Sequence, residues 1–232
     1  MPLVLEVQNV IKRYQGLRPL RLQALTVSAA ERVAVIGLDA AAAEVLVNLV
    51  TGASLPDQGS VRVLGRDTAD IASGDEWLGT LDRFGIVSER AVLLEGATIE
   101  QNLAMPFTLQ MDPVPPETSG RVSSLAKECG IGLESLNRTT GDAPPEIRAR
   151  VHLARAVALG PSLLILEHPT ASIPTAYWNT YAADIARLAD ARALAALVIT
   201  QDEAFANRVA HRTLKLDPAT GALRAPKRGW FR

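Results

Sequence analysis

Two short, uninterrupted apolar runs restrict the fold of this chain more than any other feature of its sequence. They occur in SLLILEHP (162–169) and in LAALVITQD (194–202). Each run has the length of a strand and does not alternate with polar residues, which is typical of strands buried on both faces of a parallel sheet. An alanine-rich stretch from about Thr175 to Ala191 lies between them and has the length of a helix. This alternation predicts an α/β protein with a mainly parallel sheet.

The first part of the chain is rich in strand patterns, and the middle part is mostly helical. Apolar periodicity predicts a helix from Ala42 to Gly52, where the glycine is placed to end it. Proline-punctuated helical sequence then runs from about Ala91 to Gly141. The other predicted elements are an edge strand in 3–14, two strands in 21–36 with a turn near Ala29, a short strand in 55–67, a strand in 83–89, a loop in 111–120, a helix over 145–159, and a short helix and a strand after 202.

These elements predict one domain of 232 residues. Its core is expected from about 1–90 and 160–225. The helical sequence of about 91–155 interrupts that core, so we expect it to form an inserted helical subdomain.

Composition and charge exclude several classes of function. The formal net charge is −1, so no global attraction to nucleic acid is expected. A single cysteine, Cys129, excludes an internal disulfide and a Cys-rich metal site. No signal-peptide layout and no apolar run near the roughly 20 residues of a membrane helix are present, which predicts a cytoplasmic protein. The basic tail KRGWFR (227–232) is either a contact for a membrane surface or partner, or a loose tail.

Three longer segments together carry a family resemblance. They are LVNLVTGASLPDQGSVRVLGRD (46–67), EQNLAMPF (100–107) and RARVHLARAVALGPSLLILEHPTASI (148–173). In order and spacing they resemble the ATP-binding cassette family, the nucleotide-binding subunits of ABC transporters. The resemblance covers about Leu5 to Leu223. It implies a P-loop NTPase-type core, mainly parallel, with antiparallel edge strands and the helical insert.

The turn GLDAAAAEV (37–45) falls where that family has its phosphate loop, G-x-x-G-x-G-K-[ST]-[ST]. In such a loop glycine amides surround the phosphates, lysine neutralises them and a hydroxyl holds Mg²⁺. Here only the first glycine is kept, and two acidic side chains add repulsion for phosphate. The resemblance therefore implies the remains of a phosphate loop, with Gly37 kept, Ala40 and Ala42 replacing glycines, Ala43 replacing the lysine, Glu44 replacing the Mg²⁺-binding hydroxyl, and Asp39 as the second acid.

The family's other nucleotide contacts are replaced as well. The resemblance implies no catalytic residue, no metal site and no nucleotide held by this chain alone; ATP and Mg²⁺ are expected only if a partner cassette supplies the site. Tyr14 and Gly37 are the only candidate nucleotide contacts, and Tyr14 is alternatively an aromatic without a ligand. The replaced positions are Glu167 for the Mg²⁺-linked Asp, His168 for the catalytic Glu, Gln201 for the switch His, Glu89 for the Q-loop Gln, and Ala143–Ile147 for the Leu-Ser-Gly-Gly-Gln signature.

Two features keep an alternative interpretation. Glu167 and His168 could form a base or half of a metal site at a strand end, but no second His or Cys is placed to complete it, which favours a decayed motif. The segment after Glu89 resembles the surface that grips the membrane subunit, although an insert must also keep its own core. Its expected permease-docking residues are Glu89, Leu93, Leu94, Ile99, Met105 and Phe107.

Three hypotheses of function follow from the resemblance. The first is a catalytically degenerate cassette subunit, peripheral to the inner face of a membrane, docked on a permease and paired with a second cassette or a second copy. The second is a cassette-fold scaffold without a role in transport. The third is an ATPase that works through unusual residues, for which Arg90 is the one candidate cation that we identify.

Overall fold

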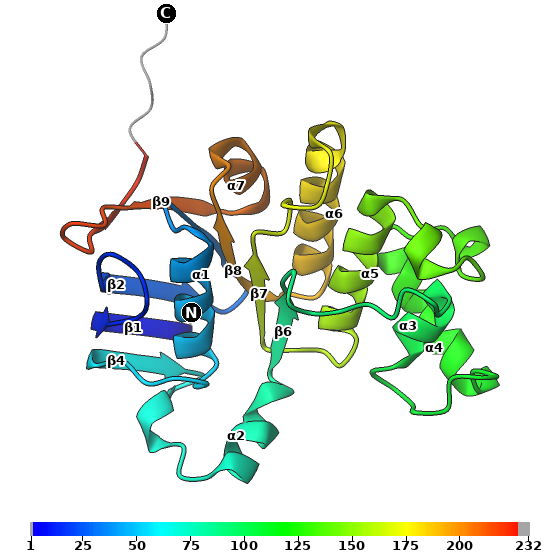
Figure 1. Ribbon diagram of the computed structural model, residues 1–232, viewed down its shortest axis with the longest axis horizontal. Coiled ribbons are helices and arrows are strands. Elements are labelled where there is room, and N and C mark those ends of the chain that lie inside the picture. Colours follow the sequence, from blue (N-terminus) through cyan, green and yellow to red (C-terminus); the bar gives the residue numbers. More distant parts are fainter. Residues whose placement is uncertain (1, 227–232) are drawn as a thin grey trace, which may run out of the picture.

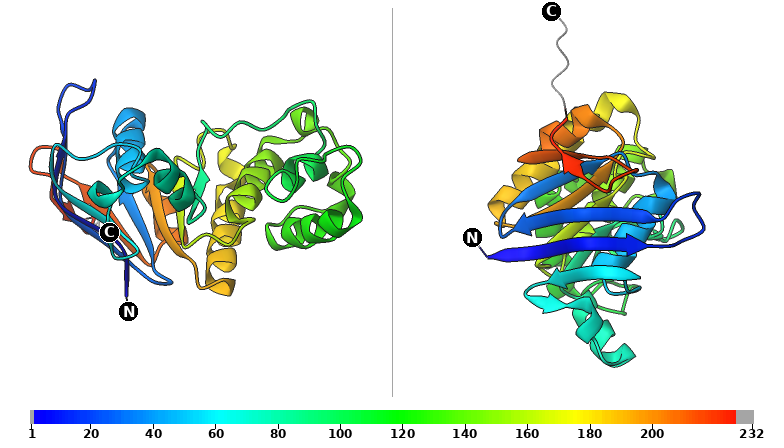
Figure 2. Two further views of the ribbon diagram at one scale, coloured as in Figure 1. Left: turned by 90° about the horizontal axis from the view of Figure 1, so that it is seen from below. Right: turned by 90° about the vertical axis from the view of Figure 1, so that its left-hand side faces the viewer.

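The computed structural model of the protein describes residues 2–226, so the tail motif KRGWFR lies outside the described residues. Two sheets and a helical layer follow one another along the molecule (Figures 1 and 2). The antiparallel sheet forms one end, and the helices of the insert form the other (Figure 2). Between residues 2 and 226, no helix combines the length and apolarity needed to cross a membrane.

The larger sheet confirms the prediction from the two apolar runs. Its strand order is β10–β9–β3–β8–β7–β6, and β3, β6, β7, β8 and β9 run parallel. The two runs pair directly, with Leu163 opposite Ala195 and Glu167 opposite Ile199. The bounds are β3 Arg32–Ile36, β6 Phe84–Val87, β7 Leu163–Glu167, β8 Ala195–Thr200, β9 Arg212–Leu216 and β10 Leu223–Arg224.

The smaller sheet is antiparallel and has the order β2–β1–β4–β5. The prediction of an edge strand in 3–14 is wrong, because β1 pairs with β2 on one side and with β4 on the other. Alternation reports that one face of a strand is buried, and it carries no information about neighbours in the sheet. The bounds are β1 Leu3–Lys12, β2 Leu20–Ser28, β4 Gln58–Val63 and β5 Arg66–Asp67.

Helix α1 (Ala40–Val50) lies between the two sheets (Figure 2). Alternate residues of the central strands divide between two cores, because successive side chains of a strand point to opposite faces. Val33 and Val35 pack with α1 and the antiparallel sheet, whereas Ala34 and Ile36 pack with the helices on the other face. Because α1 packs between the two sheets, its first residues lie at the carboxyl ends of β3 and β7.

Most of the remaining helices cover the other face of the parallel sheet or form the insert, whereas α2 lies at the lower edge of the molecule, between the antiparallel sheet and β6 (Figure 1). The expected loop 111–120 is partly wrong, because α4 begins at Pro116, where a proline fits the first turn of a helix. No helix was predicted for α2. The bounds are α2 Gly74–Leu81, α3 Ile99–Ala104, α4 Pro116–Glu128, α5 Pro145–Val157, α6 Trp178–Ala191 and α7 Glu203–Val209, with 3₁₀ turns at Thr68–Asp70, Leu133–Ser135, Thr140–Asp142 and Thr175–Tyr177.

Candidate functional site

The first turn of α1 carries its own anion. Gly37 leaves β3 with φ of +94°, which makes the sharp turn into the helix. Asp39 is the N-cap, and its Oδ1 accepts a hydrogen bond of 2.8 Å from the backbone N–H of Ala42. The amide of Ala43 donates to the Asp39 carbonyl at 2.8 Å. The Asp39 carboxylate therefore occupies one of the amides that an anion could use at this helix N-terminus, that of Ala42.

Ala43, at the position expected for the lysine, is fully buried. Its methyl group packs in the core between α1 and the two sheets. The next residue, Glu44, is exposed, and its carboxylate contacts Arg90 in the segment after β6. The helix start therefore presents an acid, and no base, toward the carboxyl ends of the strands.

Arg90 joins the two acidic positions where the family binds its metal. Its Nη1 donates to Glu44 Oε1 at 2.9 Å, and its Nη2 donates to Glu167 Oε2 at 2.7 Å. Glu167 ends β7 with a side chain that is only 8% exposed, so it depends on this guanidinium for a counter-charge. The hydroxyl of Ser88 also accepts from the backbone N–H of Arg90, at 3.2 Å. This arrangement does not fit a magnesium ion, because the Arg90 guanidinium already bridges the two carboxylates.

An open hollow beside this bridge contains most of the other predicted positions. It has a volume of about 520 Å³ and is lined by Ala40, Glu89, His168, Gln201 and Asp202, among others. Among the residues of the described chain that line it, two carry carboxylates and none is Lys or Arg. The structure therefore brings these residues together, and the carboxylates of Glu89 and Asp202 make this hollow acidic.

His168 is held in an unusual backbone conformation. Its φ is +45°, and its amide donates to the Ile199 carbonyl at 2.8 Å. Its buried Nε2 has no hydrogen-bond partner among the described residues. Backbone strain of this kind is common at functional sites. His152 lines a cavity of about 30 Å³ together with Glu167 and His168, but residues 2–226 contain no group of three or more His, Cys, Asp or Glu placed to hold a metal ion.

Tyr14 lies in the loop after β1, on the same side as the start of α1. Burial and then the charge of Asp39 raise the pKa of its hydroxyl. Gly16 folds so close that a Cβ there would come within 2.5 Å of the Tyr14 ring. The Tyr14 ring is thus covered in part by its own loop, which leaves less of the ring face for a nucleotide base to stack on.

A groove separates the core from the helical insert. Its volume is about 400 Å³, and it is lined by β6, α5 and the segment around Met105. Burial and the nearby Arg155 and Arg148 lower the pKa of His152 in its wall, so the imidazole is neutral at pH 7. Leu159, at the rim, is 54% exposed. A groove lined by apolar residues together with Asp82, His152 and Arg155 suits an amphipathic helix from another protein.

Only part of the expected docking set lies on this groove. Met105 lines it, and Leu94 is 45% exposed nearby in sequence. Ile99 and Leu93 are buried in the insert's core, so their side chains cannot contact a partner. Phe107 packs under the Arg121 guanidinium, 3.9 Å from its ring centre, and Glu89 faces the hollow instead. Most apolar residues of a short insert are needed for its own core. The sequence alone does not distinguish them from apolar residues that bind a partner.

Asn102 is a key residue that sequence reasoning did not select. It is fully buried, and its Oδ1 accepts from the Leu94 amide at 2.9 Å. Its Nδ2 donates to the carbonyls of Leu94 and Thr98 and to Thr140 Oγ1. A polar residue inside the apolar pattern of EQNLAMPF was the available signal. Asn102 ties the segment after Glu89 to the insert.

Removing the Asp39 cap tests the first turn of α1. We expect Asp39→Ala to lower the free energy of unfolding by about 1 kcal/mol, the usual value of an N-cap hydrogen bond. Urea denaturation measures the change. Asp39→Asn, which keeps an acceptor oxygen, should cost clearly less. Equal losses in both variants would show that the charge, and not the cap, stabilises the turn.

Comparisons with known proteins agree with this architecture. A protein-family model described as ABC transporter matches residues 20–171. The methionine import ATP-binding protein MetN of Caulobacter vibrioides is 31% identical over 217 residues, which cover 90% of this chain and 63% of MetN. The lipoprotein-releasing system ATP-binding protein LolD of Alcanivorax borkumensis is 28% identical over 211 residues, 88% of this chain and 91% of LolD. The dimeric structure of the bacterial ABC transporter cassette MJ0796 has a TM-score of 0.78 at 21% identity, covering 98% of this chain and 100% of that one.

Proposed function

Since the chain belongs to the ABC transporter family of ATP-binding cassettes, we propose that it is a cassette subunit that does not hydrolyse ATP at its own phosphate site. It acts as a structural or regulatory half of a transporter. The observation that carries this proposal is the bridge from Arg90 to Glu44 and Glu167. A guanidinium fixed between these carboxylates takes the place of the metal that phosphate transfer requires.

The charges around α1 support the same conclusion. Asp39 occupies the helix N-terminus, where a β-phosphate would accept amide hydrogen bonds. Glu89 and Asp202 line the hollow where the terminal phosphate would lie. Within the signature positions, Pro144 is the N-cap of α5 and Pro145 is its first residue, and neither has an amide hydrogen to donate. Neither half of a shared nucleotide site is therefore complete on this chain.

The groove supports a role in assembly. We propose that Met105, Leu159 and the neighbouring wall residues bind a helix of a membrane permease, which holds the chain at the inner face of the membrane. A second cassette, or a second copy of this chain, completes the assembly. A cassette-fold scaffold without a transport role would leave this groove unused, so co-purification with a membrane subunit distinguishes the two.

The names of the relatives favour a different candidate function. MetN and LolD are both called ATP-binding proteins, and an ATPase with unusual residues remains the competing proposal. Arg90 is then the cation that meets the phosphates. For this it must leave Glu167, whose carboxylate is 8% exposed, so ATP binding would have to offset the loss of that ion pair.

Calorimetric titration of Mg-ATP into the purified chain tests the proposal. We expect no binding heat up to millimolar ATP for the chain alone, and no phosphate release in a parallel hydrolysis assay. The same titration with the co-purified partners separates ATP held by a second cassette from ATP held here. Micromolar binding together with phosphate release by the lone chain would overturn the proposal and establish the competing one.

A further inference from the structure

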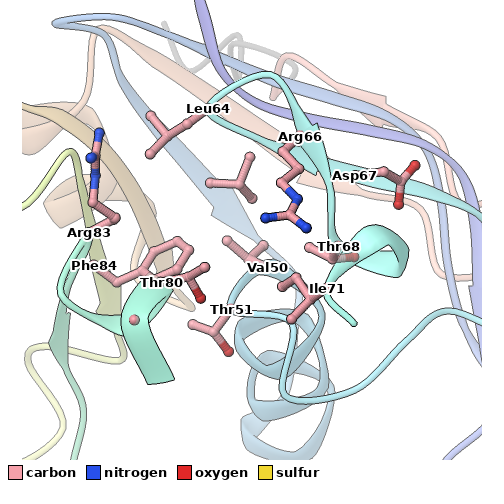
Figure 3. A pocket seen from close by; sticks show the side chains of 12 residues that line it. Val50, Thr51, Leu64, Arg66, Asp67, Thr68, Ile71, Thr80, Arg83 and Phe84 are labelled. Carbon is pink, nitrogen blue, oxygen red and sulfur yellow. The ribbon is translucent and has the colours of Figure 1, made fainter. Parts of the chain in front are cut away.

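A second cavity opens at the other end of α1 from Asp39. Its volume is about 370 Å³, within the usual range for sites that bind small molecules. The end of α1, the β4–β5 hairpin, α2 and the start of β6 enclose it (Figure 3). It belongs neither to the bridge of Arg90 nor to the open hollow.

The interior of this cavity is largely apolar. Val50 and Val63 are buried, and Ile71 and Phe84 are half-buried. Figure 3 shows the Phe84 ring on the side opposite Ile71 and Thr68, with Val50 between them. Walls of this kind accept a flat or branched apolar group and bury it from water.

One buried hydroxyl in the wall lacks a partner. Thr68 is 5% exposed, and its Oγ1 forms no hydrogen bond with the described residues. Leaving such a group unpaired costs free energy, because buried hydroxyls normally find a donor or acceptor. Its Oγ1 has almost no accessible surface, so the apolar wall, and not this hydroxyl, faces a ligand in the cavity.

The cavity also has a cation that is free to meet an anion. Arg83 donates from Nε to Ser162 Oγ at 3.2 Å, and it has no acidic partner between residues 2 and 226. The second arginine, Arg66, is already bound to Glu76 at 2.5 Å and to the Asp70 carbonyl. Asp67 is the one carboxylate of the lining, and its Oδ1 caps the Ala69 amide. The charge left unmatched at this cavity is therefore that of Arg83.

We propose that this cavity binds a small organic carboxylate with an apolar body. The carboxylate pairs with Arg83, and the apolar body packs between Phe84 and Val50. A single unmatched positive charge suits a monoanion better than a phosphate. Phe84 also lines the groove, so a bound ligand shares a wall with the proposed permease contact. The binding site itself stands without the proposed function.

Trp77 provides a built-in reporter for binding. Its indole Nε1 donates to the carbonyl of Thr51, which lines the cavity, at 2.9 Å. Trp178 donates to the Ile173 carbonyl at 2.8 Å, away from this cavity, and serves as the internal control. In ¹H–¹⁵N spectra of the full chain, phenylacetate should shift the Trp77 indole signal with millimolar affinity and leave that of Trp178 in place. Neutral phenylacetamide and inorganic phosphate should shift neither.

Gly79 allows the cavity to be filled. It lies in α2 and lines the cavity, and a Cβ there would meet nothing within 4 Å. Gly79→Leu should therefore abolish the Trp77 shift without disturbing the fold. Gly74→Leu, on the same helix and outside the cavity lining, should bind as the wild type does. Arg83→Gln should weaken binding about tenfold, the usual effect of losing a charge-assisted hydrogen bond.

Several results would overturn this proposal. One is a Trp77 signal that does not move in the wild-type chain at tens of millimolar phenylacetate. Others are equal shifts with phenylacetamide, a stronger response to phosphate, or unchanged binding in Gly79→Leu. The dispersion of each variant's spectrum confirms that it is folded.

Discussion

Replacing Arg90 by alanine is expected to destabilise the protein and to create a dependence on divalent cations that the wild type lacks. Glu167, whose side chain is 8% exposed in the wild type, would lose its counter-charge. Leaving a buried carboxylate unpaired costs about 1–3 kcal/mol, and the 44% exposure of Arg90 places the loss toward the lower end. Glu44 and Glu167, freed from the guanidinium, would then share a cation. Urea denaturation with and without millimolar Mg²⁺ or Mn²⁺ measures both effects.

Two further variants make that result specific. Arg90→Ala combined with Glu167→Gln should recover most of the lost stability and lose the response to metal, because the orphaned charge is removed as well. Arg138→Ala changes an exposed arginine for which the described residues show no ion pair, and it should behave as the wild type. An Arg90→Ala protein that is as stable as the wild type and indifferent to both metals would contradict the role assigned to the bridge.

Replacing Asn102 by leucine is expected to have the largest effect on stability, roughly 3–5 kcal/mol. Leucine has nearly the same shape, but it leaves the amide and carbonyl of Leu94 and the hydroxyl of Thr140 without their partner. All of these groups lie in or beside the insert's core, where an unpaired polar group is costly. Thermal and urea denaturation measure the loss. Hydrogen exchange should show that protection falls first around Leu94 and Thr98.

The matched control for this variant is Asn137→Leu. Asn137 is exposed, so its replacement should change the free energy of unfolding by less than about 0.5 kcal/mol. Thr140→Val removes only one of the partners of Asn102 and should give an intermediate loss. If Asn102→Leu were no worse than Thr140→Val, the tie between the segment after Glu89 and the insert would not depend on this side chain.

Uninterrupted apolar runs and a glycine that ends a helix made much of this fold predictable. The apolar runs ending at Leu166 and Ile199 fixed two central strands, and Gly52 marked the end of α1 with φ of +73°. Elements without such a pattern were missed or misplaced. Helix α2 has no fully buried residue, so its sequence lacks the periodic apolar face that would predict a helix. Pro116 resembled a loop residue because proline serves loops and first helical turns equally well.

The family resemblance, and not a physical argument from the residues, selected Glu44, Glu167 and Gln201 as positions of one site. The structure brings Glu44 and Glu167 together on Arg90, and Gln201 lines the adjoining hollow. The ion pairs could not be read in this way, because Arg90 lies 46 residues from one acid and 77 from the other. Side-chain direction also decided the docking set, since Leu94 and Ile99 are equally apolar and only one of them is exposed.

The counter-charges supplied by Asp39 and Arg90 are covalent parts of the polypeptide. Proteins that bind a ligand only when folded gain stability with its concentration, so their amount in the cell follows the supply of that ligand. If the phosphate site of this chain binds no nucleotide, as proposed above, its folding gains no stability from ATP in this way. Its resistance to proteases would then not follow the supply of ATP in the cell.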